Sequence, residues 1–264
     1  FGLTLASRRA EKVEAAADKQ AWETAHRDLH YRLISACRMP LLLAFSATLH
    51  DLNDRYRRLF LIGRPLDKIV RREHNDICNA ALERNADLAC NIMREATYAS
   101  ADSSLWFFHA LERYVAVSGD RNTVAQLMPM LREIIELHMA GTQLGITVDE
   151  RDALLIATAP RLTWMDAWQG DVVATPRRGK PVEINALWHN AVRLLAEWGE
   201  AGLYPMLFHR YYALADRIRE SFNARFWNDA THALFDVIDG DTGDDDAIRP
   251  NQLFAITLAH PVLA

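Results

Sequence analysis

The sequence has few cysteines, no long apolar run and no strong excess of either charge, and each absence excludes a class of protein. Three cysteines in 264 residues do not suggest a disulfide framework and suit a reducing compartment. There is no run of about 18 apolar residues, so no membrane-spanning helix is predicted, and no secretory signal is apparent. A net charge of −5 argues against nonspecific nucleic-acid binding. We therefore expect a cytoplasmic protein with no nucleic-acid and no membrane partner.

The composition changes along the chain and predicts two units, residues 1–96 and 97–264. The first 96 residues carry 16 Lys and Arg against 13 Asp and Glu, a net +3, whereas the rest carry 14 against 22, a net −8. All three cysteines lie in the first part and six of the seven tryptophans lie in the second. An asymmetry of this size indicates two units of separate origin.

Apolar periodicity predicts a mostly helical chain. Glycines after two of the expected helices, at Gly119 and Gly141, indicate helix ends. The best strand candidate is 233–238, which runs into a turn-rich segment. Residues 141–182 lack a regular pattern and are long for an unstructured connection, and such loops are often functional. The expected helices cover 7–38, 40–60, 65–95, 103–117, 122–140, 183–199 and 204–226.

Residues 162–188 concentrate the side chains that carbohydrate sites use. Aromatic faces stack on sugar rings, Asn and Arg bind hydroxyls, and a carboxyl group transfers the proton. Asp166 is the candidate acid, because Trp164 and Trp168 flank it and partial desolvation raises a carboxyl pKa. The residues alone leave open a plainer role for Asp166 as a turn or helix-capping aspartate.

Five motifs in the same order resemble the glucosidase half of glycogen debranching enzymes, the amylo-α-1,6-glucosidases. They begin near Thr97 and continue to the end of the chain. The resemblance implies a six-hairpin α/α toroid, of which this chain is expected to hold the middle portion. The motifs are Asp102-Ser103-Ser104-Leu105-Trp106, Gly141-Thr142 with Gly145 to Asp149, Leu162 to Ala167, Lys180 to Trp188, and Arg249-Pro250-Asn251-Gln252.

The resemblance implies hydrolysis of the α-1,6-linked glucose at glycogen-type branch points, without a cofactor. Asp166 is then the general acid of an inverting enzyme, which also needs a second carboxylate as base. No such base is identified in the sequence. The implied substrate-binding residues are Trp106, Trp164, Arg177, Glu183, Asn185, Trp188, Arg249 and Asn251. Plainer roles stay open for them: core packing for the tryptophans, helix-start charge and capping for Glu183 and Asn185, and an ordinary loop arginine for Arg177.

The first unit places His26 and His30 four residues apart, so both share one face of the expected helix. The run from Trp22 to Leu42, with Asp54 to Leu59, resembles the FadR-like C-terminal effector (FCD) domain of GntR-type transcription regulators. That resemblance implies a divalent metal, Zn, Ni or Mn, bound by His26, His30 and His74, which helps to hold a small carboxylate effector. The family's last histidine is absent near Ala96, so three ordinary helix histidines remain the alternative.

The fold class predicted from the whole chain is all-α, a partial FadR-like bundle joined to a partial six-hairpin toroid, with a little β structure in 233–240. The join is expected near residue 96, inside one helix. No Gly, Ser or Pro linker occurs at 90–100. Three hypotheses follow: a debranching-type glucosidase fragment without activity of its own, a metal-dependent small-acid sensor module, or a non-functional chimera of two gene fragments.

Overall fold

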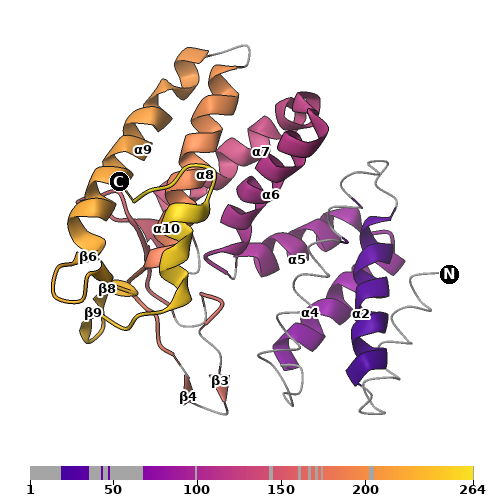
Figure 1. Cartoon of the computed structure of the whole chain (residues 1–264). Helices are drawn as coiled ribbons and strands as arrows, with labels where there is room; N and C mark the ends of the chain where they lie inside the picture. The colour runs from indigo at the N-terminus through magenta and orange to yellow at the C-terminus, as the bar shows by residue number, and fades with distance from the viewer. Residues whose placement is uncertain are drawn as a thin grey trace. The chain divides into compact units, whose positions relative to one another are not determined.

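The computed structural model describes residues 19–35, 43, 47, 68–98, 100–142, 145–159, 162–165, 168–169, 172–173, 175–201 and 205–263. The chain divides into two compact units, Phe1–Ala96 and Thr97–Ala264. The structure is mostly helical with a few short strands, which confirms the predicted all-α class (Figure 1). No helix in the described part of the chain is long and apolar enough to cross a membrane.

The first unit contains α2 (Lys19–Ile34) and α4 (Lys68–Leu82), and α5 (Ala86–Tyr98) begins in it. Leu29 of α2 packs against Cys78 of α4, and both are buried. The single helix predicted over 65–95 is wrong in one respect, because it breaks at residues 83–85. Arg84 there adopts a left-handed conformation with φ of 57°, and the Asn85 side chain caps the Leu88 amide of the next helix. The helix predicted over 40–60 lies almost wholly outside the described residues.

The second unit is built on α6 (Ser103–Ser118), α7 (Arg121–Ala140), α8 (Val182–Glu200) and α9 (Pro205–Phe226), which confirm the helices predicted there. Gly119 ends α6 in a left-handed conformation with φ of 70°, as predicted. The next residue, Asp120, starts α7 by accepting hydrogen bonds from the Asn122 and Thr123 amides. Gly141 follows the last residue of α7, so the two predicted helix ends are confirmed.

Helix α8 lies at the centre of the second unit and is buried on nearly every side. It is contacted by α6, α7 and α9 and by the short α10 (Phe254–Thr257), and α8 and α9 lie side by side in Figure 1. Apolar side chains cover one half of the helix, and polar side chains on the other half, such as Glu183 and Asn185, are buried with hydrogen-bond partners. Gly199 allows a close approach of α9, because a Cβ at this position would overlap the Phe208 ring.

Short strands fill much of the stretch predicted to be irregular. β1 (Ile146–Val148) pairs with β2 (Leu155–Ala157), and β3 (Trp168–Gln169) pairs with β4 (Val172–Val173). β5 (Lys180–Pro181), β8 (Val237–Gly240) and β9 (Gly243–Asp245) form a three-stranded sheet in the order β5-β8-β9.

The strand predicted over 233–238 is divided in two. β7 (Ala233–Leu234) pairs with β6 (Trp227–Asn228), and β8 starts only at Val237. The division arises at Asp236, whose amide bonds to the Asp245 carbonyl and whose carbonyl accepts from the Val182 amide at the start of α8. Asp236 is thereby fixed where β5 passes into α8.

Candidate functional site

A buried ion pair joins Arg177 to Glu183 across β5. Glu183 lies in the first turn of α8, directly after the strand, and Arg177 lies just before it. The guanidinium donates to both carboxylate oxygens, with Nη2 2.6 Å from Oε2, and neither side chain has more than 1% of its surface exposed. Burial raises the pKa of the Glu183 carboxyl and Arg177 opposes that rise. Because both carboxylate oxygens accept from the arginine, Glu183 is ionised in this pair.

Asp236 is the centre of the same network, and the sequence analysis did not single it out. Its carboxylate accepts from Arg177 Nε at 2.9 Å, from Arg249 Nη1 at 2.7 Å and from Asn251 Nδ2 at 2.9 Å. Arg249 also pairs with Asp245 at 2.7 Å. Pairing of β5 with β8 brings these residues together, since Asp236 immediately precedes β8. A buried carboxylate requires such partners, because leaving it unpaired costs several kcal/mol, on the order of 3–5.

The network reaches the surface at Trp164. This residue is 42% exposed, and its Nε1 donates to Asn251 Oδ1 at 3.1 Å. The Asn251 amide also lies 3.0 Å from the Met165 sulfur. The segment that immediately precedes the candidate acid is thus attached to the buried charges. Asp166 itself lies outside the described residues.

Asp102 is a second acidic residue to which the sequence analysis assigned no role, although it lies in a motif shared with the family. It lies directly before α6 and is almost completely buried. Burial raises its pKa, while the Ser100 hydroxyl bond and the Arg177 charge act in the opposite direction. The backbone beside it also contacts the motif that begins at Leu162, since the Ala101 amide donates to the Leu162 carbonyl at 2.7 Å.

Asn185 and Trp188 are core residues in this structure. Asn185 has no exposed surface, accepts from the Leu155 amide at 2.7 Å and donates to the Leu155 and Pro181 carbonyls. Trp188 is also fully buried, and its Nε1 donates to the Ala153 carbonyl at 3.1 Å. Protein covers both side chains, so the described conformation does not offer them to a sugar. They hold the turn between β1 and β2 against α8.

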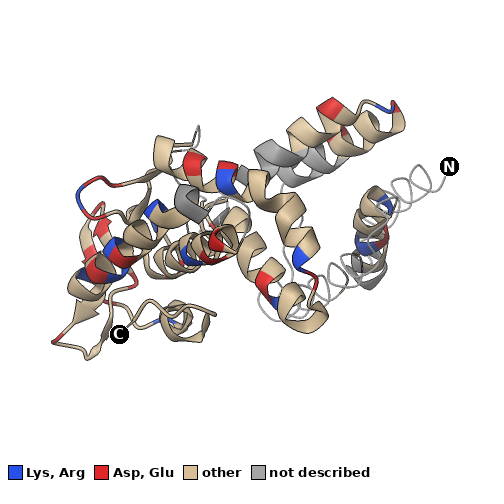
Figure 2. Cartoon of the chain, turned by 90° about the horizontal axis from the view of Figure 1, so that it is seen from above, with Lys and Arg blue, Asp and Glu red and all other residues tan. Residues whose placement is uncertain are grey.

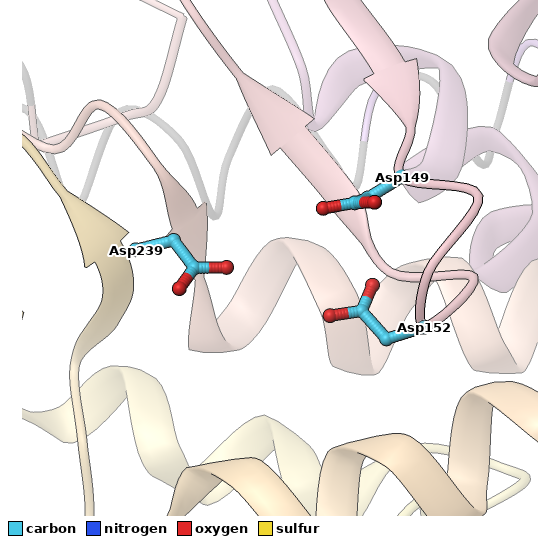
Figure 3. A group of neighbouring side chains, drawn as sticks. All are labelled: Asp149, Asp152 and Asp239. Carbon is cyan, nitrogen blue, oxygen red and sulfur yellow. The ribbon is translucent and has the colours of Figure 1, made fainter.

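A separate charge cluster surrounds Lys180. The carboxylates of Asp149, Asp152 and Asp239 point toward one another in Figure 3, and their oxygens are close enough to hold a metal ion. The fully buried Lys180 Nζ lies 2.8, 2.6 and 2.8 Å from these three carboxylates, so the ammonium already supplies a positive charge at their centre. Arg225 pairs with Asp152 and Asp239, each at 2.7 Å.

The predicted histidine ligands lie on two helices of the first unit. His26 and His30 are both on α2, and His74 is on α4. His30 is half-buried. The side chains of His26 and His74 lie outside the described residues, so their convergence stays a prediction.

A buried network of acids and arginines thus leads to the exposed Trp164 on a mostly helical scaffold. The chain belongs to the amylo-α-1,6-glucosidase family, whose family model matches residues 76–264. A second family model, for the FCD domain, matches residues 3–97. The two matches overlap over 76–97, within α4 and α5. The chain therefore joins an FCD-like segment to a glucosidase-family segment, as the two resemblances predicted.

Two individual proteins are similar to parts of this chain. An uncharacterized HTH-type transcriptional regulator, BphR, of Paraburkholderia xenovorans (strain LB400), is 36% identical over 73 residues, which are 28% of this chain and 30% of that protein. A GH78 family rhamnosidase of Bacillus sp. GL1 aligns with a TM-score of 0.46 and 17% identity over 59% of this chain and 15% of its own. The chain thus spans less than a third of either protein.

Proposed function

We propose that residues 97–264 bind a branched, glycogen-type α-glucan, with Trp164 as a sugar platform and Asp166 as the general acid toward an α-1,6-linked glucose. The exposure of Trp164, two residues before Asp166, is the observation that carries the proposal. An aromatic face suits a sugar ring, and a fixed ring binds with a smaller loss of conformational entropy than a mobile one. Family membership supports the glucosidase chemistry.

The predicted binding residues divide by exposure into two groups. Trp164, Trp106 and Arg249 retain some exposed surface, and we assign them to direct sugar contact. Trp106 is partly buried and packs edge-on against His109 and Phe254. The second group is buried, and we assign it to support of the site rather than to direct contact. It comprises Arg177, Glu183, Asn185, Trp188 and Asn251.

We expect binding without release of glucose. Inverting hydrolysis needs a second carboxylate that takes a proton from water. Glu183 and Asp236 are the carboxylates of the buried network, and both are engaged by arginines without access to solvent. A carboxylate whose oxygens are both occupied by a guanidinium, and which solvent does not reach, cannot take a proton from an attacking water.

Titration of the purified chain with a branched limit dextrin tests this function. Trp164→Ala should weaken affinity roughly tenfold, the equivalent of about 1.4 kcal/mol, and Asp166→Asn should retain binding. Trp227→Ala is the matched control, because Trp227 is equally exposed at 42%. Failure of the unaltered chain to bind would refute the glucan proposal. Glucose release that Asp166→Asn abolishes would refute the expectation of binding alone.

A second candidate function concerns the first unit, which the FCD match and the BphR similarity favour. We propose that it binds a divalent metal through His26, His30 and His74 and with it a small carboxylate effector. Titration with Ni²⁺ or Zn²⁺ should give one site that disappears in His30→Ala, with His50→Ala as control. Loss of the ion from both variants alike would count against these ligands. We expect no salt-sensitive DNA binding in a gel shift.

A further inference from the structure

The Asn251 side chain connects two groups whose hydrogen-bonding roles are fixed. It is completely buried, and each polar atom has a partner. At one end lies the Asp236 carboxylate, 2.9 Å from Nδ2, and at the other lies the Trp164 indole, whose Nε1 is 3.1 Å from Oδ1. An ionised carboxylate can only accept, and an indole N–H can only donate.

These constraints give the amide a single orientation. Turning it over would place the amide oxygen against the Asp236 carboxylate and the NH₂ group against the indole N–H, so both contacts would become repulsive. Asp236 is in turn fixed by Arg177, with distances of 2.9 and 3.1 Å, and by Arg249 at 2.7 Å. The buried Asp236 carboxylate therefore determines that the oxygen of the Asn251 amide, and not its nitrogen, is directed toward Trp164.

Trp227 shows what an indole of equal exposure does without such a connection. Its Nε1 donates to Asp229, two residues away, at 2.9 Å, and no buried charge follows. Trp164, by contrast, is held by a residue 87 positions further along the chain. The Trp164 bond therefore connects the motif that begins at Leu162 to the Arg-Pro-Asn-Gln motif at 249–252, whereas the Trp227 bond is local.

We propose that Asp236 and Asn251 are positioning residues that hold the Trp164 ring in its sugar-binding orientation. The sugar-binding part of this proposal rests on the proposed glucan function, whereas the hydrogen-bond connection does not. Neither residue touches the substrate: Asn251 acts on the ring, and Asp236 acts on Asn251. Loss of Asn251 should therefore remove its hydrogen bond to the indole N–H and weaken glucan affinity while the rest of the network stays paired.

Indole ¹⁵N–¹H spectra of the full chain test the connection without any sugar. The Trp164 signal is assigned by its loss in Trp164→Phe, and Trp227 serves as the internal reference. In Asn251→Leu the Trp164 signal should shift and its hydrogen exchange should accelerate roughly fivefold to tenfold, as expected for the loss of one hydrogen bond, while Trp227 is unchanged. An unchanged Trp164 signal in a folded variant would overturn the proposal.

Asn251→Asp keeps the size of the side chain and serves if Asn251→Leu does not fold. Its carboxyl group can donate to Asp236 only when it is protonated, so the Trp164 signal should return toward that of the unaltered chain as the pH is lowered. A signal independent of pH would contradict the connection through Asp236, because a merely space-filling role predicts none of this reversal.

Titration of the same variants with branched limit dextrin tests the purpose. Asn251→Leu should lose part of the affinity that Trp164→Ala loses, and the double variant should lose no more than Trp164→Ala alone. If the losses of affinity multiply, the two residues act independently and the proposed positioning of Trp164 by Asn251 is wrong. If the unaltered chain binds no dextrin while the indole signals respond as expected, the glucan function is refuted and the hydrogen-bond connection from Asp236 through Asn251 to Trp164 is supported.

Discussion

Two buried cations three residues apart, Arg177 and Lys180, organise their carboxylates in different ways. Arg177 lies before β5 and binds Glu183 and Asp236 through the two edges of its planar guanidinium. Lys180 lies in β5 and collects Asp149, Asp152 and Asp239 around one ammonium. Planar donors suit paired recognition of carboxylates, whereas a lysine acts as a compact charge with three donors.

The two networks also differ in what they reach. The Arg177 network continues through Asp236 and Asn251 to the exposed ring of Trp164. The Lys180 network ends in Arg225 and Arg151, which pair with the same aspartates. Lys and Arg positions are interspersed with Asp and Glu positions in Figure 2, so charge alone does not mark the candidate site. The connection to the exposed Trp164 distinguishes the Arg177 network.

The largest effect is expected from Arg177→Met. It leaves Glu183 and Asp236 buried with fewer partners, so the free energy of unfolding should fall by about 3–5 kcal/mol. Arg178→Met is the matched control: the adjacent arginine pairs with Asp241, both side chains are about half exposed, and the loss should stay below about 1 kcal/mol. Urea unfolding of the two variants measures the difference. Equal losses would mean that the buried pairs contribute no more than a surface pair.

Lys180→Ala should cost somewhat less, about 2–3 kcal/mol, because Arg225 still neutralises part of the charge. The change also empties the centre of three carboxylates, and oxygen ligands of this kind suit Ca²⁺. Millimolar Ca²⁺ should therefore raise the melting temperature of Lys180→Ala and leave that of the unaltered chain unchanged. A Ca²⁺ response of the unaltered chain would indicate that the triad binds metal despite Lys180.

The helices of the second unit were predictable, because their sequences show the apolar periodicity of helices that pack on a core. α8 matches the prediction over 183–199 to within a residue at each end. The strands in 141–182 were not predictable, because each has only two or three residues, and one of them, β5, depends on a partner distant in sequence, as Lys180 pairs with Ile238. A two-residue strand carries no alternation that a sequence pattern could reveal.

The candidate site was predictable only in part, for the same reason. Arg177, Glu183, Arg249 and Asn251 were singled out by motif, and the structure brings them together. Asp236, which joins them, sits in a stretch that resembled an ordinary strand. Its position before the acidic turn gave no signal, because its partners are contributed by segments up to 59 residues away. The sequence also did not show that Trp188 is buried whereas Trp164 is exposed, although both lie in motifs of the same family.

The smallest effect concerns His189, which lies on the central helix but in neither network. Burial lowers its pKa from 6.5 to about 4, although the bond to the His260 carbonyl opposes the shift. Above pH 6.5 the ring is neutral in both folded and unfolded chains, so stability is fully present. Between pH 6.5 and 4 only the unfolded chain takes up the proton, so stability falls as the pH falls. At pH 5.5 the loss should be roughly 1 kcal/mol.

His189→Gln keeps a donor for the carbonyl and removes the titration. The free energy of unfolding measured with urea should therefore change less between pH 7.5 and 5.5 than it does in the unaltered chain. Some acid sensitivity should remain, since burial also lowers the pKa of His138. An identical pH dependence in the variant would show that His189 takes up its proton at the same pH in the folded and the unfolded chain, so that burial does not lower its pKa.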